Sequence, residues 1–152
     1  MEHANHLNRI AWSATLHCLT GCAIGEVLGM VIGTALGWGN AATIALAVVL
    51  AFVFGYAFTL VPLLKAVGVG AALKLALAAD TASITVMEIV DNAIMLLIPG
   101  ALEAGLTDVL FWGSLAASLV IAGAVAFPVN RWLIARGKGH AVVHGHHHGH
   151  AR

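Results

Sequence analysis

Side chains that can bind metal ions recur at every fourth residue near the start of the chain. The row consists of Cys18, Cys22, Glu26 and Met30, and His17 lies directly before it. Residues four apart share one side of an α-helix. Thiolate and thioether groups suit copper(I), thiolate with imidazole suits zinc, and a carboxylate widens the choice. Alternatively, the two cysteines are small apolar core residues; a disulfide is the weaker interpretation, because the spacing is not Cys-x-x-Cys.

A later apolar stretch carries three acids on one helical face. At about 100° per residue, Asp80, Glu88 and Asp91 fall within an arc of about 80°. An acid at the centre of a transmembrane helix costs roughly 3 kcal/mol on the insertion scale. We therefore expect all three to face the interior of a bundle, where they bind protons, water or cations. The alternative is that they are protonated and only hold the helices together through hydrogen bonds.

The end of the chain is rich in histidine. Six imidazoles lie within eleven residues, at His140, His144, His146, His147, His148 and His150. Neutral imidazole is the commonest protein ligand for zinc, copper and nickel, and the intervening glycines predict a flexible segment. We interpret this tail as a metal collector. A solvated low-complexity tail and an expression tag are the alternatives.

A row of glycines predicts close helix packing beside the Cys/Glu row. Its members are Gly21, Gly25, Gly29, Gly33 and Gly37. Small residues at this spacing let a second helix approach closely in lipid. The alternative is that the row forms part of a close-packed pore wall.

The elements that position these residues follow from the composition. Of 152 residues, 61% are apolar and only 9% are charged, against roughly 25% charged in a soluble domain. Two cysteines are too few for a small secreted fold held together by disulfides. Seven basic residues balanced by seven acidic ones argue against nucleic-acid binding. The expected fold is all-α, an integral membrane bundle of four transmembrane helices. The four apolar stretches are 13–37, 41–64, 72–98 and 108–134.

The basic residues predict the orientation of this bundle. Four spans place all seven Lys and Arg on one side, and the positive-inside rule makes that side the cytoplasm. Both termini are then cytoplasmic, with a segment 1–12, a transmembrane domain 13–135 and a His-rich tail 136–152. The first and third helices run parallel. At about 1.5 Å per residue, the cysteines would lie at the depth of Asp80, and Glu26 at the depth of Glu88.

Three strings carry a resemblance to a known family. They are His17-Cys18-Leu19-Thr20-Gly21-Cys22 with Gly25-Glu26, Met87-Glu88-Ile89-Val90-Asp91-Asn92, and Pro128-Val129-Asn130-Arg131-Trp132 with Gly137-Lys138-Gly139-His140. With them, nearly the whole chain after the first ten residues resembles a bacterial membrane family known as domain of unknown function 4396. The resemblance implies a small multi-span protein of the bacterial inner membrane and no particular chemistry.

We therefore expect a protein that handles or transports a transition-metal ion (copper, zinc or nickel). The intramembrane ligands would be His17, Cys18, Cys22, Glu26, Asp80, Glu88 and Asp91, and the tail would collect the metal. The alternatives are a structural or accessory subunit of a larger membrane complex and a proton-linked carrier of a small solute. Neither an enzymatic activity nor an organic cofactor is expected. The expected partners are the lipid bilayer and the metal ion, with a homo-oligomer or a larger complex completing the pathway.

Overall fold

Four long helices make up the described part of the chain. The computed structural model describes residues 1–136, apart from the side chain of Leu75. The helices are α1 (Glu2–Ala35), α2 (Asn40–Val67), α3 (Val69–Leu97) and α4 (Val109–Ala135). Each is long and apolar enough to cross a membrane, so this is a membrane protein of the all-α class. The histidine-rich tail lies outside the described residues.

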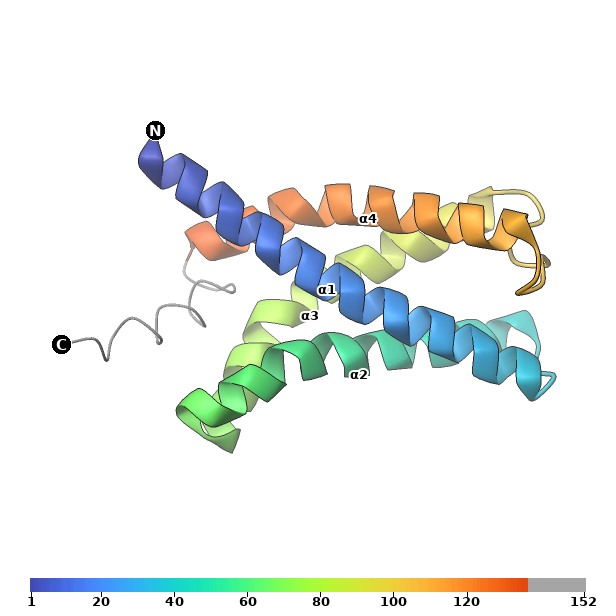
Figure 1. The fold of residues 1–152 in the computed structure, drawn as a ribbon, viewed down its shortest axis with the longest axis horizontal. Helices are drawn as coiled ribbons and strands as arrows, with labels where there is room; N and C mark the ends of the chain where they lie inside the picture. Colours follow the sequence, from blue (N-terminus) through green and yellow to red (C-terminus); the bar gives the residue numbers. More distant parts are fainter. Residues whose placement is uncertain (137–152) are drawn as a thin grey trace.

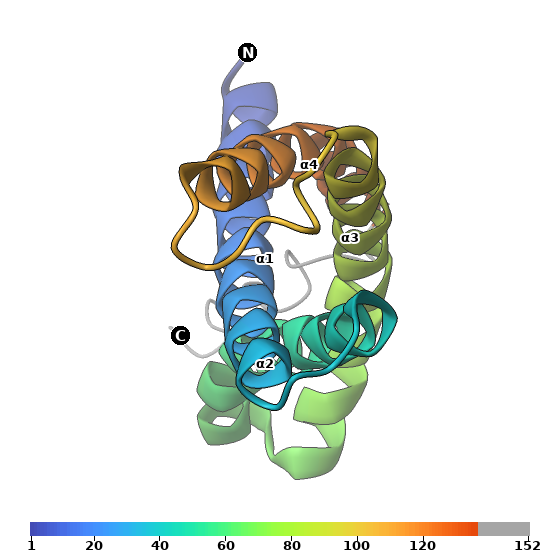
Figure 2. The same cartoon turned by 90° about the vertical axis from the view of Figure 1, so that its right-hand side faces the viewer.

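The helices run alternately in opposite directions (Figure 1). Met1 and Arg136 lie at one end of the bundle, here called the terminal end. The α1–α2 and α3–α4 connections lie at the other, here called the loop end. Helix α1 packs against all three other helices and most extensively against α2, whereas α2 and α4 do not pack against each other. Viewed along the bundle, α3 lies across from α1 (Figure 2).

The first helix begins much earlier than the hydropathy predicts. It starts at Glu2 rather than near Ser13, so residues 2–12 are helical and continuous with the first apolar stretch. Residues 2–12 contain no Gly or Pro that would interrupt a helix. Although several of them are polar, the helix continues through them because it packs against α4. Here Ala11 packs near Ile134 of α4, and Arg131 Nε donates to Asn8 Oδ1 at 2.7 Å.

Three glycines lie in the connections between the helices, and one aspartate caps the start of α4. Gly37, Gly68 and Gly100 have φ of +67°, +83° and +81°, a region that favours glycine because it has no Cβ. Asp108 is the N-cap of α4, and its carboxylate accepts from Leu110 N at 2.9 Å. An acid suits this position because it satisfies a free N–H and faces the positive end of the helix dipole.

Small residues bring α1 and α2 into backbone contact. The contacts pair Gly21 with Gly55, Gly25 with Ala51, Gly29 with Ala47 and Gly33 with Thr43. A Cβ added at Gly21 would lie 2.8 Å from the Gly55 Cα, closer than any packed pair of carbons. The predicted packing row is therefore present but ends at Gly33. Gly37 lies beyond the helix in the turn, with no atom near its Cβ position.

Candidate functional site

Two groups of cysteine and acid side chains lie in the described bundle interior, and the first joins Cys18 of α1 to Asp80 of α3. The Cys18 Sγ and Asp80 Oδ1 atoms lie 3.7 Å apart, and both residues are fully buried. Thr59 of α2 hydrogen-bonds Asp80, and His17 lies within electrostatic reach of it. The His17 ring also meets the Phe58 ring edge-on, with 5.3 Å between centroids. The equal depth of Cys18 and Asp80 expected from the helix register is thus confirmed.

The second group lies farther toward the loop end and contains three carboxyl groups. This acid cluster is formed by Glu26 of α1 with Glu88 and Asp91 of α3, and Cys22 adjoins it. The exposed fractions of Glu26, Glu88 and Asp91 are 4%, 5% and 3%, and Cys22 is fully buried. The expected pairing of Glu26 with Glu88 is therefore present, and Asp91 joins them.

The hydrogen bonds of the acid cluster are uneven. Ser118 of α4 donates to Asp91 Oδ1, and Asn92 Nδ2 donates to Glu88 Oε2 at 3.5 Å. Both oxygens of Glu26 are buried, and neither makes a hydrogen bond of acceptable geometry within the described residues. Glu26 thus faces two further acids from its place on α1 with little polar support.

The described residues provide no buried basic partner for this cluster. Arg9, Lys65, Lys74, Arg131 and Arg136 are all exposed. Carboxylates within a membrane are costly unless they are protonated, paired or bound to a cation. The arrangement can therefore take up protons or cations, and it cannot form a buried salt bridge with Lys or Arg of the described helices.

The predicted metal ligands do not form one coordination shell. They divide between the Cys18–Asp80 pair with His17 and the acid cluster with Cys22. Across residues 1–136, no three or more His, Cys, Asp or Glu side chains are arranged to hold a metal ion together. The remaining predicted ligands, His144, His146, His147, His148 and His150, lie outside the described residues.

Three features of the interior were not anticipated from the sequence. Helix α2 carries its own row of buried small residues at every fourth position, namely Thr43, Ala47, Ala51, Gly55 and Thr59. Ser118 supplies the polar contact between α4 and the acid cluster. Asn130 Nδ2 donates to Thr15 Oγ1 at 2.9 Å, which ties α4 to α1 near the terminal end. The repeat in α2 and the isolated polar residues of α4 are visible signals in the sequence.

Comparisons with known proteins identify the family. No curated protein and no solved structure matches the chain. The model of one family matches residues 8–139, which take in α1 from Asn8 onward and the whole of the other three helices. The chain therefore belongs to the family described as Domain of unknown function (DUF4396).

Proposed function

We propose that this protein binds a cation at the acid cluster and moves or stores it within the membrane. The observation that carries the proposal is Glu26, a buried acid beside Glu88 and Asp91 with no buried Lys or Arg in the described helices. A cation at this point would neutralise the cluster and give the Glu26 oxygens a partner. The bacterial inner membrane is the proposed location.

The side chains beside the acids favour a transition metal. Cys22 adjoins Glu26 and Glu88, so a thiol and carboxylates can contribute to one site. Mixed thiolate and carboxylate ligands suit zinc, and thiolate also suits copper. The described side chains are not arranged as a coordination shell. Each Glu carboxyl sits at the end of three rotatable bonds, so rotamer changes alone can bring Glu26 and Glu88 together around an ion.

The Cys18–Asp80 pair would serve as a second station nearer the terminal end. Cys18 precedes Cys22 by four residues on α1, about 6 Å at 1.5 Å per residue. His17, with its imidazole beside Asp80, adds a ligand there. The proposed route runs along the shared interior of α1 and α3, and the histidine-rich tail would deliver or receive the ion at the terminal end.

One observation favours the alternative of a structural or accessory subunit. Ser118 already donates to Asp91, and Asn92 donates to Glu88. A protonated Asp91 held by Ser118 would tie α3 to α4 without any ion, whereas the Asn92–Glu88 bond lies within α3. Glu→Gln changes separate the two functions, because glutamine keeps the size and hydrogen bonding of a protonated acid but lacks its charge.

Zinc binding and uptake by Glu26→Gln and Glu88→Gln test the proposal. The full-length protein is studied in detergent by equilibrium dialysis and in liposomes that contain a zinc-sensitive dye. Glu103→Gln, an exposed acid in the α3–α4 connection, is the matched control, and the tail is present in every sample. Changing even an outer-shell partner of a metal typically costs 10–100-fold in affinity, so both cluster variants should lose at least about tenfold. Wild-type zinc binding and uptake in both would favour the structural subunit.

A further inference from the structure

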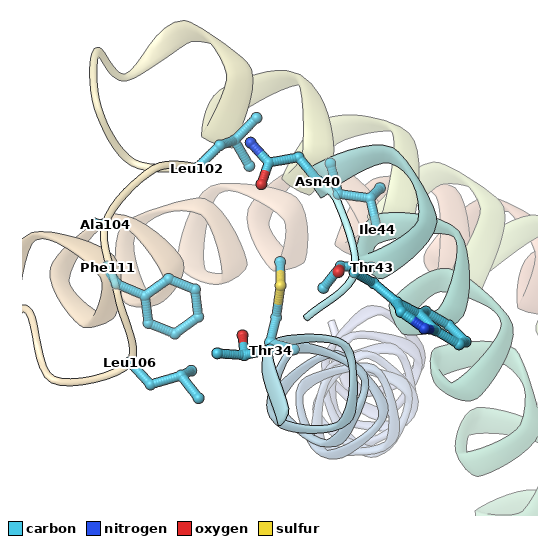
Figure 3. Close-up of a pocket in the computed structure, with 10 residues that line it drawn as sticks. Thr34, Asn40, Thr43, Ile44, Leu102, Ala104, Leu106 and Phe111 are labelled. Carbon is cyan, nitrogen blue, oxygen red and sulfur yellow. The ribbon is translucent and has the colours of Figure 1, made fainter. Parts of the chain in front are cut away.

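A small cavity opens into the bundle at the loop end (Figure 3). Its volume is about 70 Å³. Thr34, Asn40 and Thr43 give it polar walls from α1 and α2, and Met30 and Phe111 line it from α1 and α4. At about 30 Å³ per water molecule in the liquid, this space holds on the order of two waters with polar partners. It is a recess at the loop end with room and polar partners for water.

An apolar layer shares two side chains with the wall of this cavity. Met95, Phe111 and Leu115 are buried against one another, and Met30 packs against them. Met30 and Phe111 therefore belong both to the wall of the cavity and to the apolar layer. These four side chains are apolar.

The acid cluster lies close to this layer along α1 and α3. Met30 is four residues from Glu26 on α1, and Met95 is four residues from Asp91 on α3. A separation of four residues is about 6 Å along a helix. On α4, which runs the other way, Leu115 is three residues from Ser118, the partner of Asp91. About one helical turn thus separates Met30 from Glu26 on α1, Met95 from Asp91 on α3, and Leu115 from the Asp91 partner Ser118 on α4.

We propose that the cavity is the entrance to the acid cluster from the loop end and that the apolar layer is its closed gate. This inference rests on the proposed cation function, because an entrance needs a site to serve. An apolar constriction excludes ions while it is dry. Methionine is unbranched and adaptable, so a rotamer change of Met30 can open the layer while the helices stay in place. A cation that enters would pass from the threonine and asparagine oxygens to Glu26.

Cys22 is a natural reporter for this route. It is fully buried and adjoins Glu26 and Glu88 below the layer. A cationic, membrane-impermeant methanethiosulfonate reagent can reach it from the loop end only through the gate. The full-length protein is placed in liposomes, the reagent is added to either face, and the labelled cysteine is identified by mass spectrometry.

The gate predicts a specific pattern of labelling. Thr34→Cys, in the cavity wall, should react rapidly from the loop end. Wild-type Cys22 should react slowly, and Met30→Ala and Phe111→Ala should each raise its rate at least tenfold from that end. Val31→Ala is the matched control, because Val31 is exposed on the outer face of α1 and should leave the rate unchanged.

Three results would overturn the proposal. They are an unreactive Thr34→Cys, an unchanged Cys22 rate in both layer variants, and faster labelling of Cys22 from the terminal end. Thr34→Cys leaves the layer intact, so it remains informative if a layer variant does not fold. Labelling needs no bound ion. If Cys22 becomes accessible while zinc binding is absent, the cation function fails and the gate remains. If zinc binds but labelling does not change, the gate fails and the cation function remains.

Discussion

Replacing Gly25 by alanine should separate α1 from α2 and disturb the acid cluster. A Cβ at Gly25 would overlap the backbone of Ala51 and Leu50. Backbone atoms cannot move aside like the end of a side chain, so α2 must retreat by on the order of 1 Å to restore normal contact distances. Overpacking of this kind costs about 1–3 kcal/mol. The other Gly contacts along the row would loosen with it.

Gly113→Ala is the matched control, and it isolates this packing cost. Gly113 lies in α4, is exposed and has no atom within 4 Å of its Cβ position. Both substitutions gain about 1 kcal/mol of helix propensity, so that gain cancels in the comparison. The free energy of unfolding of Gly25→Ala should therefore lie about 1–3 kcal/mol below that of Gly113→Ala.

The two buried cysteines provide the assay. Cys18 and Cys22 are fully buried and should react with a thiol-specific fluorophore only on unfolding. Titration of the protein from mild detergent into sodium dodecyl sulfate, read by this reaction, gives the free energy of unfolding of each variant. Because Glu26 follows Gly25 directly, zinc binding should also fall in Gly25→Ala and stay normal in Gly113→Ala. Equal stabilities within about 0.5 kcal/mol would refute the close backbone contact of α1 and α2.

Three further outcomes are expected. Ser118→Ala removes the hydrogen bond to Asp91 and should lower the free energy of unfolding by about 1–2 kcal/mol in the same titration. The control is Thr20→Ala, because the Thr20 hydroxyl donates only to a carbonyl of its own helix. A loss for Ser118→Ala no larger than that of Thr20→Ala would contradict the interhelical role of Ser118. Truncation after Gly139 should reduce the capacity for zinc, nickel or copper in equilibrium dialysis. It should preserve the unfolding curve, because α4 ends at Ala135. An unchanged metal stoichiometry would leave the tail without a role in metal capture. Tags at either terminus should be accessible to protease only from the cytoplasmic face, because the Lys and Arg of residues 1–136 lie toward the terminal end. Cleavage of either tag from outside intact cells would reverse the orientation.

Local properties of the sequence were enough to predict the elements and the depth of the main polar residues. Hydropathy alone separates four helices, because the interior of a membrane requires long apolar stretches. A glycine marks each of the three breaks between these helices, because glycine tolerates a positive φ. The shared depth of Cys18 and Asp80, and of Glu26 and Glu88, follows from the parallel course of α1 and α3 and the constant rise per residue.

Contacts between helices were decided only by the tertiary structure. Periodicity places Glu26 on one face of α1, but it does not say which helix that face meets. The α2 partners of the glycine row, the contact of Ser118 with Asp91 and the apolar layer above the acids all depend on how four helices are arranged around a common axis. The ligand row of α1 was divided between two groups for the same reason. Residues four apart are about 6 Å apart along a helix, so each meets a different part of α3, and one row on a helix becomes two polar groups in the bundle.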